Sequence, residues 1–168
     1  MAIIIRPATS VDLPVLHPVV ERAYRGEAAR GGWTHEADLI TGERTDIETL
    51  ASLLDGPSRL LIALEDEAIL GCVNVAHKGD GLAYLGLLCV DPQLQASGIG
   101  KRLIAAAEAT ARTDFAADRI EMTVIDRRVE LIAWYVRHGY QPSGETRPFP
   151  IILDPPLSMT VLVKNLVT

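Results

Sequence analysis

Hydrophobic positions follow two periods along the chain, and the elements that they predict alternate. Short apolar runs bounded by turn residues predict strands, whereas apolar residues three or four positions apart predict amphipathic helices. Strands are expected over residues 3–6, 59–64, 69–77, 82–90, 120–125 and 157–166. Helices are expected after Thr9, from Thr34 to residue 40, from Asp46 to near residue 55, from the loop at 95–100 to about residue 113, and over 128–138. We also expect Pro18 to kink the first helix.

This order of elements predicts a mixed α/β fold of the α+β class, in a single domain over residues 1–168. Strands and helices that alternate in this way form one mixed sheet with helices on both of its faces. A chain of 168 residues, 48% of them hydrophobic, is large enough to bury a substantial core without disulfides or metals.

The most informative stretch begins with the strand expected over 82–90. That run is almost continuously apolar, as in a strand buried on both faces, and Asp91-Pro92 ends it. The polar loop Gln-Ala-Ser-Gly-Ile-Gly at 95–100 then opens a helix. The unpaired N–H groups and the positive dipole end of a helix N-terminus suit a phosphate or pyrophosphate. Gly98 and Gly100 have no side chain to obstruct an anion, so the stretch predicts an anion-binding loop.

Two common nucleotide-binding loops do not match this stretch. A mononucleotide loop requires Ser or Thr after Gly-Lys, where Arg102 stands, and a dinucleotide loop requires a third glycine, where Leu103 stands. The remaining pattern is Gln-x-x-Gly-x-Gly after a strand and a Val-Asp-Pro turn. It resembles the acetyl-CoA loop of the GNAT superfamily of N-acetyltransferases. An ordinary strand-to-helix connection capped by Ser97 is the alternative interpretation.

A second match to the GNAT pattern lies in the helix expected over 128–138. Members of the superfamily commonly carry Asn, then Ala, then a Tyr and finally Gly-Phe at this spacing, and Tyr135 and Gly139-Tyr140 fit that pattern. In the superfamily the tyrosine hydroxyl lies near the CoA sulfur and protonates the leaving thiolate, which makes Tyr135 the catalytic candidate. From spacing alone, a core tyrosine packed against the sheet is the favoured interpretation.

The resemblance covers nearly the whole chain and implies a GNAT fold, with a mostly antiparallel sheet of about seven strands. It implies acetyl-CoA as the cosubstrate, bound where the fourth strand splays from the fifth, and Gly86 is expected to mark the bulge that begins this separation. The expected cofactor contacts are Leu88, Cys89, Val90, Gln95, Ala96, Ser97, Gly98, Ile99, Gly100, Lys101 and Arg128. Arg128 replaces the usual Asn and Leu131 the usual Ala, so Arg128 would bring a cation near the phosphates of the cofactor.

The same resemblance implies direct attack of a primary amine, on a small molecule or a peptide, at the thioester of acetyl-CoA. A base or a water relay must first take a proton from that amine, and Glu36, Glu121 and Tyr84 are the candidates. Acceptor choice is expected in the segments 24–38 and 146–156, the second of which should form a loop stiffened by prolines. Trp33 and Glu36 are the candidate acceptor contacts, and neither segment specifies which amine is used.

Charge and composition narrow the remaining partners. The net charge is −6 without a block of lysines or arginines, which argues against nucleic acid. No apolar run approaches the roughly 20 residues that span a bilayer, and the first residues lack the features of a signal peptide. Cys72 and Cys89 fall in predicted strands without metal-ligand spacing. We therefore expect buried free thiols, no metal and a reducing, cytoplasmic compartment.

Two other classes of function stay open at the level of sequence. One is a non-catalytic CoA-binding sensor or regulatory module, against which the retained Tyr135 argues. The other is a structural or interaction protein in which the glycine-bearing loop is incidental. The donor is also open to a longer acyl group than acetyl. Dimers are common in the superfamily, so a homodimer is a further expectation that the resemblance brings.

Overall fold

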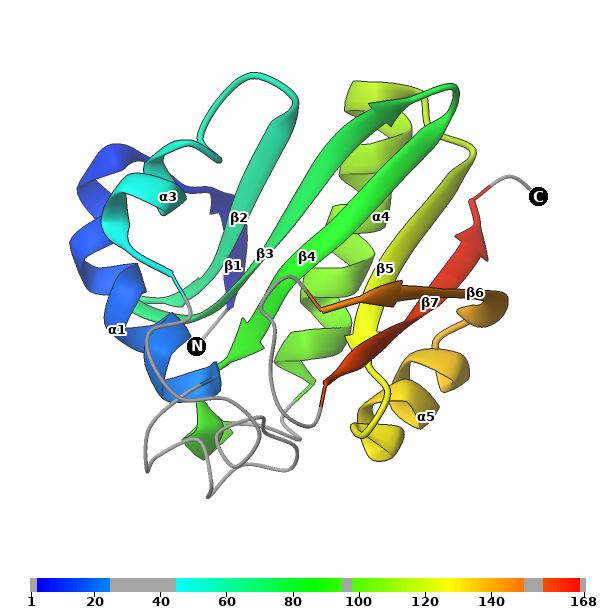
Figure 1. The fold of residues 1–168 in the computed structure, drawn as a ribbon. Coiled ribbons are helices and arrows are strands. Elements are labelled where there is room, and N and C mark those ends of the chain that lie inside the picture. Colours follow the sequence, from blue (N-terminus) through cyan, green and yellow to red (C-terminus); the bar gives the residue numbers. More distant parts are fainter. Residues whose placement is uncertain (1–2, 25–44, 95–97, 150–155, 167–168) are drawn as a thin grey trace.

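The computed structural model of the chain describes residues 3–24, 45–94, 98–149 and 156–166. Its strands form one seven-stranded sheet in the order β1-β2-β3-β4-β5-β7-β6 (Figure 1). Among the described strands, β4 and β5 form the one parallel pair, and the other neighbours pair antiparallel. The bounds are β1 Ile4–Pro7, β2 Ser58–Glu65, β3 Ala68–Gly79, β4 Leu82–Val90, β5 Arg119–Ile125, β6 Gln141–Pro148 and β7 Ser158–Asn165. The predicted mixed, mostly antiparallel sheet is confirmed.

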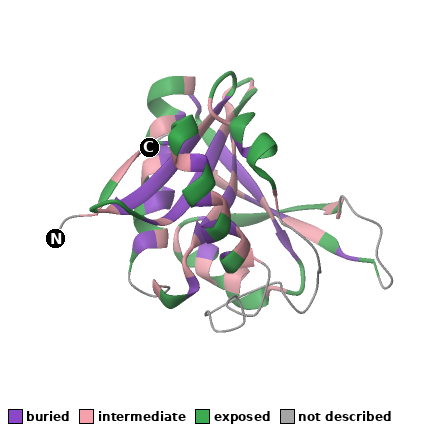
Figure 2. Ribbon diagram, turned by 90° about the vertical axis from the view of Figure 1, so that its left-hand side faces the viewer, coloured by how far each residue is buried: buried purple, intermediate pink, exposed green. Residues whose placement is uncertain are grey.

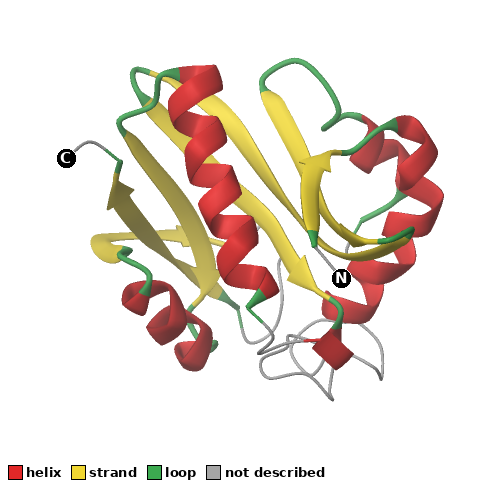
Figure 3. Cartoon of the chain, turned by 180° about the vertical axis from the view of Figure 1, so that it is seen from behind, coloured by secondary structure: helices red, strands yellow, loops and turns green. Residues whose placement is uncertain are grey.

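Helices lie on both faces of the sheet, as predicted. Helices α4 and α5 cover one face, and α1 and α3 cover the other (Figure 3). Their bounds are α1 Leu13–Tyr24, α3 Ile47–Ala51, α4 Ile99–Phe115 and α5 Val129–Arg137, with short 3-10 turns at Ser10–Asp12 and Pro92–Leu94. The helix expected from Asp46 to near residue 55 thus ends earlier, at Ala51. The helix expected over 34–40 lies outside the described residues.

Side-chain caps begin two of the helical segments where the sequence placed them. The Asp12 carboxylate accepts from the Thr9 backbone N–H at 2.7 Å, in a capping box ahead of α1. The Asp46 carboxylate accepts from the Thr49 N–H at 2.7 Å ahead of α3. These bonds satisfy donors that a helix N-terminus leaves without an intrahelical partner. Helix α1 continues through Pro18 as a single helix.

Two apolar clusters hold the layers together, one on each face of the sheet. The larger joins α4 and α5 to the sheet and contains fully buried residues such as Leu103 and Ile120. The second joins α1 and α3 to the opposite face through residues such as Leu16 and Ile62. Buried residues run through the middle of the molecule, between the helices (Figure 2).

A β-bulge interrupts the pairing of β3 with β4. Asn74 pairs with Gly86, but Cys72, two residues before Asn74, pairs with Cys89, so β4 contains one extra residue. That extra residue follows Gly86, and Leu87 takes the strained left-handed conformation, with φ +52°. Leu85 accordingly packs into the cluster on the α4 face, whereas Leu87 packs into the cluster on the α1 face. The bulge therefore reverses the face of the sheet toward which odd- and even-numbered side chains point at the end of β4.

The predicted opening between β4 and β5 is present. Their parallel pairing covers only residues 82–84 against 119–121 and ends at Tyr84 and Glu121. Beyond Glu121, β5 pairs with β7 and not with β4. The exposure of β4 alternates between buried and half-buried, so the expectation of a strand buried on both faces was wrong. At the end of the strand, the half-buried Leu88 and Val90 line an open cavity, described below.

The structure also corrects the predicted loop over 146–156, because residues 146–148 belong to β6. Strand β6 is an edge strand that pairs only with β7, and seven of its eight residues are exposed. With no buried face, it has no apolar alternation to reveal it in the sequence, and Pro142 is tolerated because one side of an edge strand needs no donor.

A stability prediction follows from the end of α4. Ala116, the exposed C-cap residue, has φ +50°, a conformation that costs an L-residue roughly 1–2 kcal/mol and costs glycine little. After allowing for the greater freedom of glycine when unfolded, Ala116→Gly should stabilise the protein by about 0.5–1 kcal/mol in urea unfolding. Ala105→Gly, on the exposed face of the same helix, is the control and should destabilise by about 1 kcal/mol.

Candidate functional site

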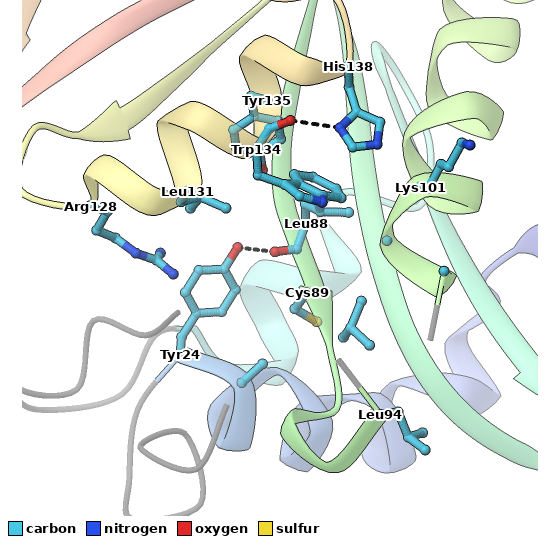
Figure 4. A pocket seen from close by; sticks show the side chains of 14 residues that line it. Tyr24, Leu88, Cys89, Leu94, Lys101, Arg128, Leu131, Trp134, Tyr135 and His138 are labelled. Atoms are coloured by element: carbon cyan, nitrogen blue, oxygen red, sulfur yellow. Dashed lines mark hydrogen bonds between the residues drawn. The ribbon is translucent and has the colours of Figure 1, made fainter. Parts of the chain in front are cut away.

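A cavity of about 380 Å³ lies where β4 ends and α4 and α5 begin. Its walls come from four elements that are far apart in sequence: the end of α1, the end of β4, the start of α4 and one face of α5 (Figure 4). The lining residues are Ala23, Tyr24, Leu88, Cys89, Val90, Leu94, Gly98, Gly100, Lys101, Arg128, Leu131, Trp134, Tyr135 and His138. Concave sites of this size are the usual location of small-molecule binding.

The strand wall of the cavity exposes backbone groups as well as side chains. The Leu88 carbonyl accepts a hydrogen bond from the Tyr24 hydroxyl, so it points into the opening and not toward β3. The Asp91 N–H donates to the Leu70 carbonyl of β3 at 2.9 Å. Because successive residues of a strand point their backbone groups to opposite sides, Val90 faces the opening, as Leu88 does. An extended ligand could therefore pair with β4 here.

The N-terminus of α4 forms the second wall. The first intrahelical bond runs from the Arg102 N–H to the Gly98 carbonyl at 3.2 Å, so the N–H groups before Arg102 have no helical acceptor. Gly98 is the N-cap with φ +88°, and a side chain on Gly100 would lie 3.4 Å from the Trp134 ring. Lys101 adds a positive charge to the positive end of the dipole. These features suit a pyrophosphate. Gln95, Ala96 and Ser97 lie outside the described residues.

Tyr135 forms part of the third wall, which is a face of α5. Its side chain is buried and meets the rings of Trp134 and Tyr140 edge to face, at centroid separations of 5.2 and 5.9 Å. Burial raises the pKa of the Tyr135 phenol above its ordinary value, and the nearby charge of Arg128 acts in the opposite direction. Within the described part of the chain its hydroxyl makes no hydrogen bond. Tyr135 is therefore a neutral phenol with a proton to donate.

Arg128 is the N-cap residue of α5 and brings a cation into the same cavity. Its side chain points toward the ring of Tyr24 (Figure 4). Burial lowers the pKa of its guanidinium, while the two tyrosines Tyr24 and Tyr135 act to raise it. The residue that departs from the family pattern thus lies within electrostatic reach of Tyr135.

The candidates for the general base lie elsewhere. Tyr84 and Glu121 do not line the cavity, but they are paired where β4 and β5 separate. The Tyr84 hydroxyl of β4 lies 2.6 Å from the Thr123 hydroxyl of β5, and this hydrogen bond connects the two strands. The Glu121 carboxylate is buried and lies 2.8 Å from the Arg147 guanidinium of β6. Glu36 and Trp33 lie outside the described residues.

The sequence analysis did not assign several cavity residues. Leu131, Trp134 and His138 follow one another at intervals of three and four residues, which places them on the face of α5 that carries Tyr135. That spacing can be read in the sequence, but of the residues on this face only Tyr135 had a chemical role that the resemblance implied. Tyr24 begins the segment 24–38 in which acceptor choice was expected, but its bond to Leu88 joins residues 64 positions apart and leaves no local pattern in the sequence.

Fold and site together provide a strand edge with which an extended ligand could pair and a helix N-terminus that suits phosphates. The family model described as the acetyltransferase (GNAT) family matches residues 20–140. The chain belongs to this family and is an acetyltransferase. A search of curated protein sequences returns no match.

Solved structures share the fold at low sequence identity. One is the PaiA N-acetyltransferase of Thermoplasma acidophilum in complex with coenzyme A, with a TM-score of 0.77 at 19% identity over 98% of this chain and 99% of that one. A ribosomal-protein-alanine N-acetyltransferase of Escherichia coli gives 0.75 at 14%, over 99% and 96%. A spermidine N-acetyltransferase chimera from Vibrio cholerae and hSSAT gives 0.73 at 14%, over 99% and 96%.

Two further properties of the described residues bear on the site. They contain no group of three or more His, Cys, Asp or Glu side chains placed to hold a metal ion. Among them, none of the helices is long and apolar enough to cross a membrane.

The N-cap glycine can be tested with a matched control. Gly98 and Gly56 both have positive φ, +88° and +66°, and both have open space around the missing Cβ, but only Gly98 lines the cavity. Gly98→Ala and Gly56→Ala should each cost about 1 kcal/mol of stability through backbone strain. Only Gly98→Ala should also weaken coenzyme A binding, by about ten-fold in titration calorimetry, because the helix N–H groups shift. Equal affinities would argue against a pyrophosphate at this loop.

Proposed function

We propose that the protein transfers the acetyl group of acetyl-CoA to a primary amine of a small molecule or peptide by direct attack. The observation that carries this proposal is the geometry of one cavity, which joins the start of α4 to the neutral phenol of Tyr135 along the open edge of β4. The helix N-terminus would bind the phosphates of acetyl-CoA, and the protonated phenol would give a proton to its departing thiolate.

The donor contacts follow from the walls of the cavity. The N–H groups of Ile99, Gly100 and Lys101, together with the segment 95–97, would hold the pyrophosphate. The backbone of Leu88, Cys89 and Val90 would align the pantetheine as an added strand. In this arrangement the Val90 N–H polarises the thioester carbonyl as negative charge develops on its oxygen. Arg128, in the same cavity, would contact the donor as a cation.

The reaction needs two proton movements. The amine nitrogen, once neutral, forms the new C–N bond at the thioester carbon, and the C–S bond breaks. Tyr135 gives its proton to the departing sulfur, so the thiolate is neutralised as it forms, and the phenol later regains a proton from solvent. The raised pKa of Tyr135 keeps the donor form populated at neutral pH.

A base must take the proton that the amine loses, directly or through water. Tyr84, Glu121 and Glu36 remain the proposed candidates. The position of Tyr84 and Glu121 at the separation of β4 and β5 supports them, since an acceptor must reach the donor through that gap. In the structure, Oε2 of Glu121 forms an ion pair with the Arg147 guanidinium at 2.8 Å, which competes with a proton for that oxygen.

The nature of the acceptor rests on the family and on likeness. Spermidine and a ribosomal-protein alanine appear in the names of two structural neighbours, so both small-molecule and peptide amines occur on this fold. Trp33 and Glu36 are the proposed acceptor contacts. The two cysteines, Cys72 and Cys89, are buried and unbridged, which fits the cytoplasmic compartment that we propose.

The role of Tyr135 can be tested by removing one oxygen atom. Tyr135→Phe keeps the ring contacts with Trp134 and Tyr140 but removes the proton donor. We expect kcat to fall by about 100-fold, measured as thiol release with acetyl-CoA and a panel of amines, because general acid catalysis typically contributes this much. The dissociation constant of coenzyme A should change less than about two-fold. Full turnover in this variant would contradict the general-acid role.

The pH dependence of the wild-type enzyme provides a second test. The acceptor amine must be neutral, so kcat/KM for the amine should rise with pH toward the pKa of a free amine, about 10. Burial raises the pKa of Tyr135 above the ordinary value of a phenol, about 10, so its phenol stays protonated through this range. The value of kcat should therefore show no fall up to about pH 10. A descending limb between about pH 8 and 9.5 would show that the essential acid is a different group.

The same assays address the alternative of a non-catalytic CoA-binding module. Such a module would show a rise in melting temperature with acetyl-CoA but no thiol release with any amine. An enzyme shows both, and the stabilisation should reach about 2.7 kcal/mol at 100 times the dissociation constant.

A further inference from the structure

A buried polar cluster outside the cavity joins three elements behind the catalytic candidate. Glu108 of α4 and Tyr140, which follows α5, are both buried, and Lys164 of β7 reaches them from the sheet. The Tyr140 hydroxyl donates to Glu108 Oε2 at 2.9 Å. Lys164 Nζ donates to Oε1 and Oε2 of the same carboxylate at 3.0 and 3.1 Å. Both oxygens of the buried carboxylate are thus satisfied.

Lys164 also fixes the end of α5. Its Nζ donates to the carbonyl of His138, the C-cap residue, at 3.0 Å. A cation in this position compensates both the unpaired carbonyls and the negative dipole end of the helix. Gly139 makes room for it, because a Cβ there would lie 3.0 Å from Lys164 Cε, and its φ of +99° suits glycine. Gly139 therefore leaves space for the Lys164 side chain, in addition to ending the helix.

Direct contacts connect this cluster to Tyr135. The Tyr140 ring meets the Tyr135 ring edge to face, at 5.9 Å between centroids. The Tyr135 carbonyl accepts from the N–H groups of His138 and Tyr140, at 2.9 and 3.2 Å. The two residues held by Lys164 and Glu108 are therefore the same two that bond to the backbone of Tyr135.

We propose that Glu108, Lys164 and Tyr140 are positioning residues that hold the Tyr135 phenol at the point where the thiolate departs. This inference rests on the proposed function of Tyr135 as the general acid. The cluster contains none of the residues that line the cavity, so it acts on the chemical step and not on binding of the donor. The hydroxyl of Tyr140 is the atom that links this residue, after the end of α5, to Glu108 of α4.

The kinetic signature of this role differs from that of a general support for the fold. Proton transfer depends on sub-ångström placement of the donor, whereas the donor itself is bound mainly through β4 and the start of α4. Loosening the cluster should therefore lower kcat and leave KM for acetyl-CoA almost unchanged. A purely structural role would lower the amount of folded protein and leave kcat per folded molecule the same.

The test compares Lys164→Met, Lys164→Arg and Tyr140→Phe, each in the wild-type protein and in Tyr135→Phe. Lys164→Met should lower kcat about ten-fold, whereas Lys164→Arg, which keeps a cation, should retain most of the wild-type kcat. Tyr140→Phe keeps the ring and should lower kcat about three-fold, which provides a result even if Lys164→Met does not fold. In the Tyr135→Phe background, Lys164→Met and Tyr140→Phe should each change kcat less than two-fold, because the hydroxyl that these residues position is already absent.

Asp114→Asn is the matched control. Asp114 carries the other described ion pair of α4, with Arg59 at 3.2 Å, but this pair is exposed and lies at the C-terminal end of the helix, whereas the cavity lies at its start. Its kcat should equal that of the wild type.

Three results would overturn the inference: folded Lys164→Met and Tyr140→Phe variants with wild-type kcat, an increase confined to KM for acetyl-CoA, or an undiminished loss in the Tyr135→Phe background. Absence of wild-type turnover would instead contradict the proposed function.

Discussion

The site depends on the end of hydrogen bonding between β4 and β5. The two strands pair only as far as Tyr84 and Glu121, and beyond that point β4 pairs with β3 alone and β5 with β7 alone among the described strands. Unpaired backbone groups inside a protein are costly unless a ligand or side chain satisfies them, and the Tyr24 hydroxyl does so for the Leu88 carbonyl. The backbone groups that face the gap between the strands therefore lack strand partners, and an extended acetyl donor could form hydrogen bonds with them. It lies at the carboxyl ends of the one described parallel pair, the position where open sheets commonly bind ligands.

Everything else at the site is arranged around that gap. The bulge after Gly86 changes the face of the sheet toward which the side chains at the end of β4 point, and α4, which begins at Ile99, contributes Gly100 and Lys101 to the same cavity. Helix α5 follows β5 along the chain, has Arg128 as its N-cap residue and carries Tyr135 on the face toward the cavity. One break in a sheet therefore brings together a strand edge, a helix N-terminus and a buried phenol.

The comparisons separate what this fold preserves from what it leaves variable. Structural neighbours with 14% to 19% identity retain the fold, with TM-scores from 0.73 to 0.77. The acceptors in their names differ, spermidine in one and a protein alanine in another. A shared fold therefore does not fix the acceptor, because function depends on the residues placed on the fold. In this chain Arg128 lines the cavity and stands where the family commonly carries Asn.

The sequence by itself determined the strands with buried faces, the helices with apolar stripes and the loop that opens α4, because each of these patterns is local. It also brought forward Tyr135, although only through the family resemblance. Tertiary structure decided the rest. Strand β6 has no buried face to leave a pattern. A bulge was expected at Gly86, but only the pairing with β3 shows that the extra residue follows Gly86. The hydrogen bonds from Tyr24 to Leu88, and from Tyr140 and Lys164 to Glu108, join residues 32 to 64 positions apart. Such contacts depend on which elements become neighbours in space, and no local periodicity records that choice.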